Sequence, residues 1–350
     1  MPKNKSAAFR AAWVYTGVIL GAGFASGQEL LRYFTRFGAA GFFGLGLMGV
    51  ILALGGWSVL DICAKNRLDD AGAFLAFVFG KRLGGFIHAV SGLFIAIVFA
   101  AVLAGGGAMA GEVFGVPHSA GVLVVAGLCF AVFLFDLRGV VRLNAIVSPL
   151  LVAGGVFFGI YTAFHHNAAA FWDAARALRM PDNWLWSSVT YASYNMLTAL
   201  CVLAGMRGAG LIARRGTAKM AGLLGGGMMC LLGVCFALPM YIHGGLTAEI
   251  PLHQLARQSG GRIEAFYLVL LASAICASAV SNGFAVVGLL LGKLRLQPLL
   301  VKAGVALGGA CMAHVGFSVI VSRVYPAFGA VGIFVLAASI LTALTKRKKT

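Results

Sequence analysis

The first long apolar stretch of the chain, residues 11–37, is interrupted at its centre by small and polar residues. The interruption reads Gly21-Ala22-Gly23-Phe24-Ala25-Ser26-Gly27-Gln28-Glu29. The stretch is long enough to cross a bilayer at a rise of about 1.5 Å per residue. Each glycine disfavours a helix by about 1 kcal/mol relative to alanine, because glycine loses the most backbone freedom on folding. Inside a membrane, a helix opens only where its freed N–H and C=O groups face protein, water or a ligand. The pattern indicates a binding site at membrane depth; the alternative is a continuous helix whose small residues allow close packing.

Glu29 is the ionisable residue of this interruption. A charged side chain near the centre of a span costs at least about 2.5 kcal/mol and is by default a functional hypothesis. Because burial disfavours the charged form of a carboxyl group, Glu29 is a candidate proton carrier. Two other roles are open. Glu29 could pair with a cationic substrate, or it could form a salt bridge to Arg32 or Arg36, which share its helical face at i+3 and i+7.

The composition is that of an integral membrane protein. The 350 residues are 61% hydrophobic and only 11% charged, whereas a soluble protein is about half apolar and about a quarter charged. The apolar runs are longer than the strands of a membrane β-barrel and do not alternate in polarity. The sequence therefore predicts an all-α fold. Hydropathy indicates ten spans, at residues 11–37, 41–64, 84–111, 119–137, 142–164, 187–206, 218–243, 263–291, 299–318 and 325–345.

The net charge of +17 reports membrane topology rather than nucleic-acid binding. With the N-terminus inside, 20 of the 27 Lys and Arg residues fall on the cytoplasmic side, and seven fall outside. Positive residues concentrate on the cytoplasmic side of membrane proteins, so both termini are expected there. The basic tail, residues 346–349, is expected to contact lipid headgroups. The basic and apolar N-terminus also resembles a signal peptide, but cleavage would spoil an even span count, so we expect it to be retained.

Polar side chains concentrate in two later spans. The sixth opens with Ser187, Ser188, Thr190, Tyr191, Ser193, Tyr194 and Asn195. The eighth places Ser278, Ser281 and Asn282 on one helical face at i, i+3 and i+4. The seven cysteines lie within or at the ends of spans and include no C-x-x-C pair, which predicts core residues rather than a metal or disulfide framework. We therefore expect no cofactor.

Three segments between the spans have helical patterns. Residues 69–80 are expected to form a short amphipathic helix on the cytoplasmic surface. Residues 168–178 in one outer loop look helical, and Trp172, Trp184 and Trp186 suit the interfacial aromatic belt. Residues 246–258 in another outer loop form an amphipathic piece that could act as a lid.

The ten spans divide into two halves that align with an offset of about 180 residues. Because five is odd, the second half crosses the membrane inverted, and such repeats place a binding site at the midplane where interrupted spans meet. The counterpart of the first interruption falls in the sixth span, at 187–195, although that segment contains no Gly or Pro. We predict a single domain, residues 1–350, with one repeat at about 8–165 and the other at about 185–346.

Residues 21–29, together with Phe34-Thr35-Arg36-Phe37-Gly38, resemble the signature of the YkvI family of bacterial membrane proteins. Residues 104–111 and 191–195 are similar to that family's third and sixth spans. The resemblance covers essentially the whole chain. That family is placed near the amino acid–polyamine–organocation transporters, which have the LeuT-type five-plus-five repeat and a discontinuous first helix. The resemblance implies a secondary active transporter of a small amino acid or related amine. It would work by alternating access in the bacterial inner membrane, coupled to sodium or protons.

The resemblance also implies where the substrate would lie. The unwound part of the first span would hold it, through Gly21, Ala22, Gly23, Phe24, Ser26 and Gly27. Freed N–H groups there would bind a carboxylate, the Ser26 hydroxyl would add a contact, and the carbonyls of Gly21 and Ala22 would accept from an ammonium. The sixth span would contribute Tyr191, Ser193, Tyr194 and Asn195. Ordinary interhelical packing is the alternative role for the two tyrosines.

A cation site is implied between the first and eighth spans. Span-one carbonyls, Gly21 among them, would join the hydroxyls of Ser278 and Ser281, with Asn282 alongside. The alternative is that these serines only permit close helix packing.

Two other classes of function remain in view. A ligand-sensing receptor or a channel on the same scaffold would bind the same molecule without driving its accumulation. An intramembrane enzyme is disfavoured, because the sequence has no H-E-x-x-H motif, no paired intramembrane aspartates and no G-K-[ST] phosphate loop. The expected partners are a small-molecule substrate and membrane lipids, and no nucleic acid. The sequence indicates no oligomeric state.

Overall fold

The structure is a computed structural model that describes residues 2–165, 183–212, 215–243, 246, 248–292 and 296–345. Every regular element in these ranges is a helix. The first half comprises α1 (Pro2–Ile19), α2 (Ala22–Ala25), α3 (Gln28–Tyr33), η1 (Thr35–Phe37), α4 (Ala40–Asn66), α5 (Ala71–Phe79), α6 (Lys81–Phe114), α7 (His118–Phe133) and α8 (Asp136–His165). The second half comprises α10 (Trp184–Gly205), α11 (Arg215–His243), α12 (Pro251–Gln258), α13 (Gly261–Leu291), α14 (Pro298–Met312), η2 (Ala313–Val315), α15 (Phe317–Val319), the π-helical η3 (Ile320–Val324) and α16 (Tyr325–Thr345).

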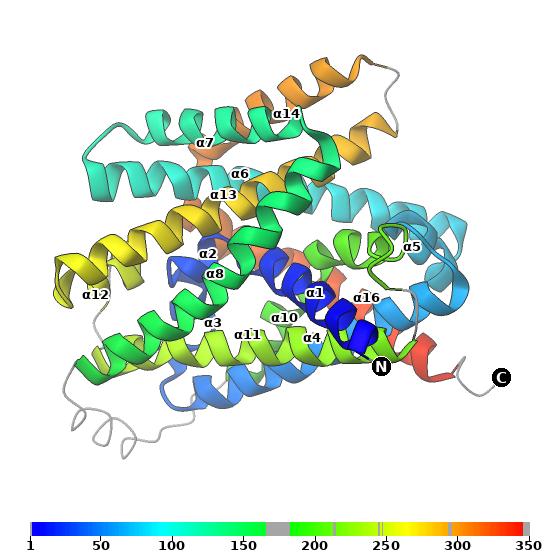
Figure 1. The fold of residues 1–350 in the computed structure, drawn as a ribbon, viewed down its shortest axis with the longest axis horizontal. Helices are drawn as coiled ribbons and strands as arrows, with labels where there is room; N and C mark the ends of the chain where they lie inside the picture. The colour runs from blue at the N-terminus through cyan, green and yellow to red at the C-terminus, as the bar shows by residue number, and fades with distance from the viewer. Residues whose placement is uncertain are drawn as a thin grey trace.

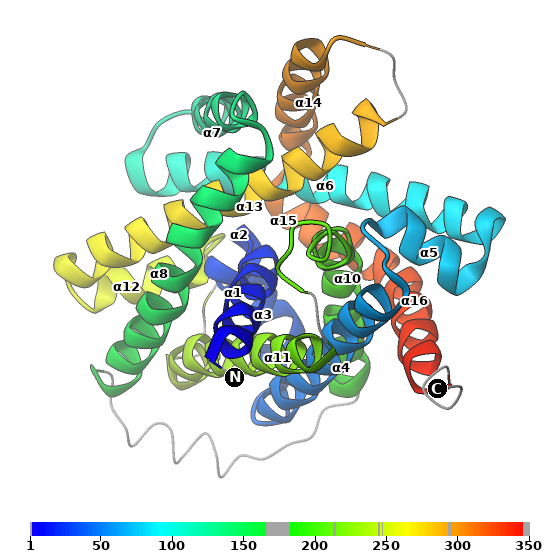
Figure 2. The same cartoon turned by 45° about the vertical axis from the view of Figure 1, so that its right-hand side comes forward.

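The long helices surround the broken first span. The pair α4 and α11 lie side by side along one edge of the molecule, and α6 and α13 cross the opposite part (Figure 1). Between them, α1 packs against α8, α10, α11 and α13, and α2 reaches α6 and α13. Figure 2 shows α1 and α3 in the middle of this arrangement, with α8, α10 and α11 around them. The interruption of the first span therefore lies in the protein interior.

The predicted break in the first span is confirmed. Helix α1 ends at Ile19, and Gly21 has an extended backbone with φ −89° and ψ −178°. The chain then makes the single turn of α2, and it bends again at Gly27, whose φ of +85° lies in the left-handed region. Residues with a Cβ rarely adopt that region, so the two glycines occupy the two points where the helix direction changes.

Fewer helices than predicted meet a strict test of length and polarity for spanning a membrane. Seven helices in the described residues are long and apolar enough, and α7 is a shorter apolar helix. The first predicted span is divided into α1, α2 and α3. Helix α1 has 18 residues but contains Lys3, Lys5 and Arg10, and α2 and α3 are short. The sixth span, α10, carries hydroxyls and an amide on its buried side, which lowers its mean hydropathy. The departure at the sixth span therefore arises at a predicted binding segment.

The sixth span, whose unwinding the sequence left open, is not interrupted. Helix α10 continues without a break through residues 187–195. Because the segment contains no Gly or Pro, its serines and tyrosines stay in helical geometry and project their side chains inward. The irregularity in the second half instead falls in the last span, where η3 is π-helical and precedes α16. The sequence of that span had indicated no interruption.

The predicted short helices are present where the chain is described. Helix α5 begins after Asp70, whose side chain accepts a hydrogen bond of 2.7 Å from the backbone N–H of Ala73. Helix α12 occupies the outer loop predicted to act as a lid. The expected helix at 168–178, Trp172 and the basic tail at 346–349 lie outside the described residues.

Candidate functional site

A small buried cavity lies at the break between α1 and α2. It holds about 20 Å³, which is enough for a water molecule or a small ion, since one water needs roughly 10–15 Å³. It is too small for an amino acid. Its walls come from the first, third, sixth, eighth and tenth predicted spans. The lining residues are Val18, Ile19, Gly21, Ala22, Gly23, Glu29, Val98, Val102, Tyr194, Asn195, Thr198, Ser278, Asn282 and Tyr325.

The backbone at the break differs from the prediction in one respect. The carbonyls of Gly21 and Ala22, predicted to be free, accept hydrogen bonds from the N–H groups of Ala25 and Ser26, at 3.0 and 2.8 Å. They are therefore not free, because α2 resumes helical pairing at once, although each carbonyl oxygen keeps a second lone pair for a further contact. The first N–H groups of a helix have no intrahelical partner, and here they belong to Ala22 and Gly23, which both line the cavity.

The Glu29 carboxylate folds back from α3 over Gly23. A Cβ atom added to Gly23 would clash with Oε1, Cδ and Cγ of Glu29, so any larger residue there displaces the Glu29 side chain. The Glu29 side chain is buried, and the hydroxyl of Tyr191 donates to its Oε2 at 3.0 Å. Among the described residues no ion pair of Glu29 is found. Arg32 donates to the backbone carbonyl of Ser322, and Arg36 lies over the Phe37 ring.

Four tyrosines form an aromatic cluster around Glu29 and the cavity: Tyr33, Tyr191, Tyr194 and Tyr325. Ring centroids of neighbouring members lie 5.0 to 5.6 Å apart. The hydroxyl groups of Tyr33 and Tyr194 are buried without a hydrogen-bond partner among the described residues. Buried polar groups normally have a partner, so two hydroxyls remain available to a bound molecule or an ion.

Two members of this cluster, Tyr33 and Tyr325, were not predicted as site residues from the sequence. Tyr33 follows Glu29 by four residues and so shares its helical face, a signal that could have been used. Tyr325 begins α16 and reaches the cavity only because the last span packs there. Thr198, which lines the cavity three residues after Asn195, was also missed.

The predicted cation ligands on α13 separate into two groups. Ser278 faces the break, because a Cβ on Gly21 would lie 3.2 Å from its Oγ. The Asn282 amide donates to the carbonyl and the Oγ of Ser278, at 2.9 and 3.2 Å. Ser281 instead donates to Ala277 and accepts from Asn144 Nδ2 at 2.8 Å, so its hydroxyl is turned towards α8. The structure therefore brings Gly21 and Ser278 together, but not Ser281.

Several other predicted site residues lie close to the cavity without lining it. Ser26 Oγ donates to the carbonyl of Gly23 at 3.1 Å and accepts from the N–H of Gln28 at 3.3 Å, which stabilises the turn. The Phe24 ring packs against Phe236, at 5.8 Å between centroids. Gly27 and Ser193 also lie outside the lining, whereas Asn195 lines the cavity and donates to the carbonyl of Tyr191 at 3.0 Å.

The short helix α12 is bonded to the turn between α2 and α3. The N–H of Leu252 donates to the carbonyl of Ser26 at 3.0 Å, and the Tyr267 hydroxyl donates to the carbonyl of Ala25 at 2.9 Å. His253 Nε2 lies 2.9 Å from Glu264 Oε1, and this contact joins α12 to the start of α13. These bonds hold the break in a closed arrangement on the α12 side.

The chain is similar over its full length to two proteins of Bacillus subtilis (strain 168). It is 26% identical over 354 residues to the membrane protein YkvI, with 99% of each chain covered. It is 23% identical over 338 residues to YyaD, with 95% of this chain and 96% of that protein covered. No family model matches the chain.

Solved transporter structures have the same fold. A Na+-coupled sialic acid symporter superposes with a TM-score of 0.64 at 14% identity, covering 97% of this chain and 79% of the symporter. MhsT in complex with L-phenylalanine gives a TM-score of 0.63 at 16% identity, covering 96% and 97% of the two chains. A manganese transporter of Eremococcus coleocola gives a TM-score of 0.60 at 13% identity, covering 96% and 76%. The chain is therefore a membrane protein with the LeuT-type transporter fold, and the resemblance to YkvI is confirmed over its full length.

Proposed function

We propose that the chain is a secondary active transporter of a small amino acid or related amine, and that the substrate binds at the break between α1 and α2. The observation that carries this proposal is the buried cavity at the break, whose lining comes from five spans and includes a carboxylate, two amides and several hydroxyl-bearing side chains. A closed interior cavity fits alternating access, because the substrate is enclosed between two openings. Since the cavity is too small for an amino acid, the site has to open before the substrate binds, either at α12 or on the opposite side of the cavity.

The coupling ion is sodium or a proton. For a proton, Glu29 is the carrier: its carboxylate is buried, faces the cavity and is hydrogen-bonded by Tyr191. For sodium, Ser278 contributes a ligand together with backbone carbonyls near Gly21, and Asn282 positions the Ser278 hydroxyl. Hard cations prefer oxygen ligands of this kind. Ser281 belongs to the originally predicted set, and it would have to rotate away from Asn144 to take part.

We also propose that residues 1–350 form one transport domain with a five-plus-five inverted repeat. The side-by-side packing of α4 with α11 and of α6 with α13 supports this, because these are corresponding spans of the two halves. The excess of Lys and Arg on one side supports an orientation in the bacterial inner membrane with both termini in the cytoplasm.

Thermal stabilisation of the purified protein tests the proposal. We would use a panel of amino acids and polyamines, with sodium or potassium, at two pH values. A molecule that binds only the folded state stabilises it by about 2.7 kcal/mol at a hundredfold excess over its dissociation constant. We expect saturable stabilisation by a member of the panel that depends on sodium or on pH. Stabilisation without substrate-driven accumulation in proteoliposomes would indicate a sensor, and a silent panel would contradict the proposed substrate class.

A further inference from the structure

A groove of about 430 Å³ lies between α4 and α11, away from the cavity at the break. It is lined by Ala53, Leu54, Trp57, Asp61, Arg215, Gly216, Lys219 and Leu223. One end is polar and lies where α4 finishes and α11 begins, and the other end is apolar. Leu54 and Leu223 are exposed, at 40% and 51%, and in a membrane protein such side chains at span depth face lipid. The groove therefore has one end at the membrane surface and one end in the hydrocarbon.

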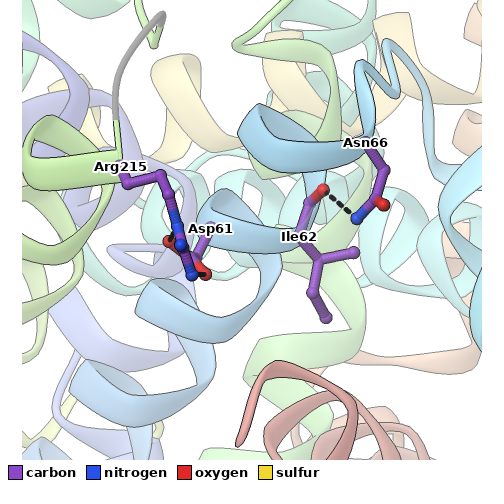
Figure 3. A network of polar contacts seen from close by, with 4 residues as sticks. All are labelled: Asp61, Ile62, Asn66 and Arg215. Atoms are coloured by element: carbon purple, nitrogen blue, oxygen red, sulfur yellow. Dashed lines mark hydrogen bonds and ion pairs between the residues drawn. The ribbon is translucent and has the colours of Figure 1, made fainter. Parts of the chain in front are cut away.

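The polar end carries more positive than negative charge. Arg215 Nε and Nη2 donate to the two oxygens of Asp61, at 2.8 and 2.9 Å (Figure 3). The Asp61 side chain is 6% exposed, whereas that of Arg215 is 45% exposed. The guanidinium has five N–H groups, so others remain available on its exposed side. With one carboxylate neutralised by one guanidinium, the charge left over at this end is that of Lys219.

Lys219 follows Arg215 by one helical turn and is exposed. Side chains on a helix point back towards its N-terminus, and lysines near membrane surfaces extend their ammonium groups to the headgroup layer. Arg215 and Lys219 both line the polar end of the groove. Between them, a Cβ on Gly216 would meet nothing within 4 Å, so there is open space at the headgroup end.

We propose that this groove binds an anionic phospholipid. Its phosphodiester lies between Arg215 and Lys219, and one acyl chain lies along Leu54, Trp57 and Leu223. The apolar wall favours a lipid over a soluble phosphate ester, because a soluble ester would leave that wall without a partner. Basic pockets between spans recognise anionic headgroups by the same chemistry. The bound lipid would join the two helices that pack side by side as corresponding spans of the two halves.

Native mass spectrometry of the delipidated full-length protein tests this proposal, with defined phosphatidylglycerol and phosphatidylcholine as probes. We expect phosphatidylglycerol to bind more tightly than phosphatidylcholine. Lys219→Ala is expected to weaken phosphatidylglycerol binding by about fivefold, since one basic residue near an anionic surface contributes on the order of 1 kcal/mol. Lys219→Arg is expected to keep the binding. Lys219 is exposed, so neither substitution is expected to disturb folding.

Lys81→Ala is the matched control, because Lys81 is an exposed lysine at the first position of α6, away from the groove. Equal losses in the two alanine variants would overturn the proposal, as would equal binding of the two lipids. Glycerol phosphate is the third probe. We expect it not to displace phosphatidylglycerol, and displacement at comparable concentration would show that the groove takes a free phosphate ester instead. None of these outcomes depends on which substrate is transported.

Discussion

Glu29 connects the break in the first span to the tyrosine cluster. Its carboxylate lies over Gly23 and accepts a hydrogen bond from Tyr191, while Arg32 is engaged with the carbonyl of Ser322. Of the three roles open from the sequence, the arginine salt bridge is not the arrangement found among the described residues. Proton transfer and pairing with a cationic substrate both require the carboxylate to face the cavity, as it does.

Glu29→Gln separates these two roles from a structural one. The amide keeps the size of the side chain and can still accept from the Tyr191 hydroxyl, but it cannot gain or lose a proton. We expect transport to lose its dependence on pH if Glu29 carries the proton. Uptake measured over a series of pH values checks this, with Glu249→Gln as the control, because Glu249 does not line the cavity at the break. An unchanged pH profile together with an unchanged KM for the substrate in Glu29→Gln would assign the carboxylate to the architecture of the site.

Ser278 and Ser281 provide a matched pair on one helix. The Ser278 hydroxyl faces the break at Gly21, and the Ser281 hydroxyl is turned towards Asn144. A hydrogen bond or ligand to a charged group contributes about 1.5–3 kcal/mol. We therefore expect Ser278→Ala to raise the sodium concentration needed for half-maximal stimulation by about tenfold or more, and Ser281→Ala to leave it nearly unchanged. A larger effect of Ser281→Ala than of Ser278→Ala would place the cation site nearer to α8.

At the scale of elements, the turn between α2 and α3 depends on its contact with α12. Gly27 has a φ of +85°, and a Cβ there would come within 2.8 Å of Leu252 Cγ. Leu252 also donates its backbone N–H to Ser26. A left-handed backbone and a close neighbour therefore both require glycine at this position, and the closed position of α12 depends on that glycine.

Gly27→Ala is expected to destabilise the protein through two effects. The left-handed backbone costs about 1–2 kcal/mol for a residue with a Cβ, and overpacking against Leu252 adds about 1–3 kcal/mol. Gly115→Ala is the control, because Gly115 is also left-handed, with φ +65° and ψ 18°, but has open space around its Cβ position. Thermal unfolding in detergent should show the larger loss for Gly27→Ala, and Leu252→Ala should recover part of the difference. Equal losses at the two glycines would mean that α12 does not press on the turn.

Some features of the elements could be predicted from the sequence, and others could not. The break at Gly21 and the turn at Gly27 were predictable, because glycine is locally unfavourable in a helix. The continuity of α10 follows from the absence of Gly and Pro in residues 187–195, whereas the repeat alone aligns this segment with the first interruption. The Ala22 carbonyl pairs locally with the N–H of Ser26, and the π-helical turn before Tyr325 has no local sequence signal. The residue types of the site were therefore more predictable than their hydrogen-bond partners.

At the scale of the whole molecule, the structure is closed around its candidate site. The cavity holds about 20 Å³, and α12 is bonded to the turn beside it on one side. A transporter must open this arrangement alternately to the two faces of the membrane. The anionic lipid proposed between α4 and α11 would lie outside the moving centre, at the seam between corresponding helices of the two halves.

The central claim is that the break between α1 and α2 is the transport site, and substrate-driven uptake into proteoliposomes tests it most directly. Gly23→Leu places a side chain where the Glu29 carboxylate now lies, whereas Gly46→Leu fills open space on α4. We expect uptake by the wild type and by Gly46→Leu, and none above background by Gly23→Leu, with all three proteins folded by thermal unfolding. Normal uptake by Gly23→Leu would contradict the assignment of the site.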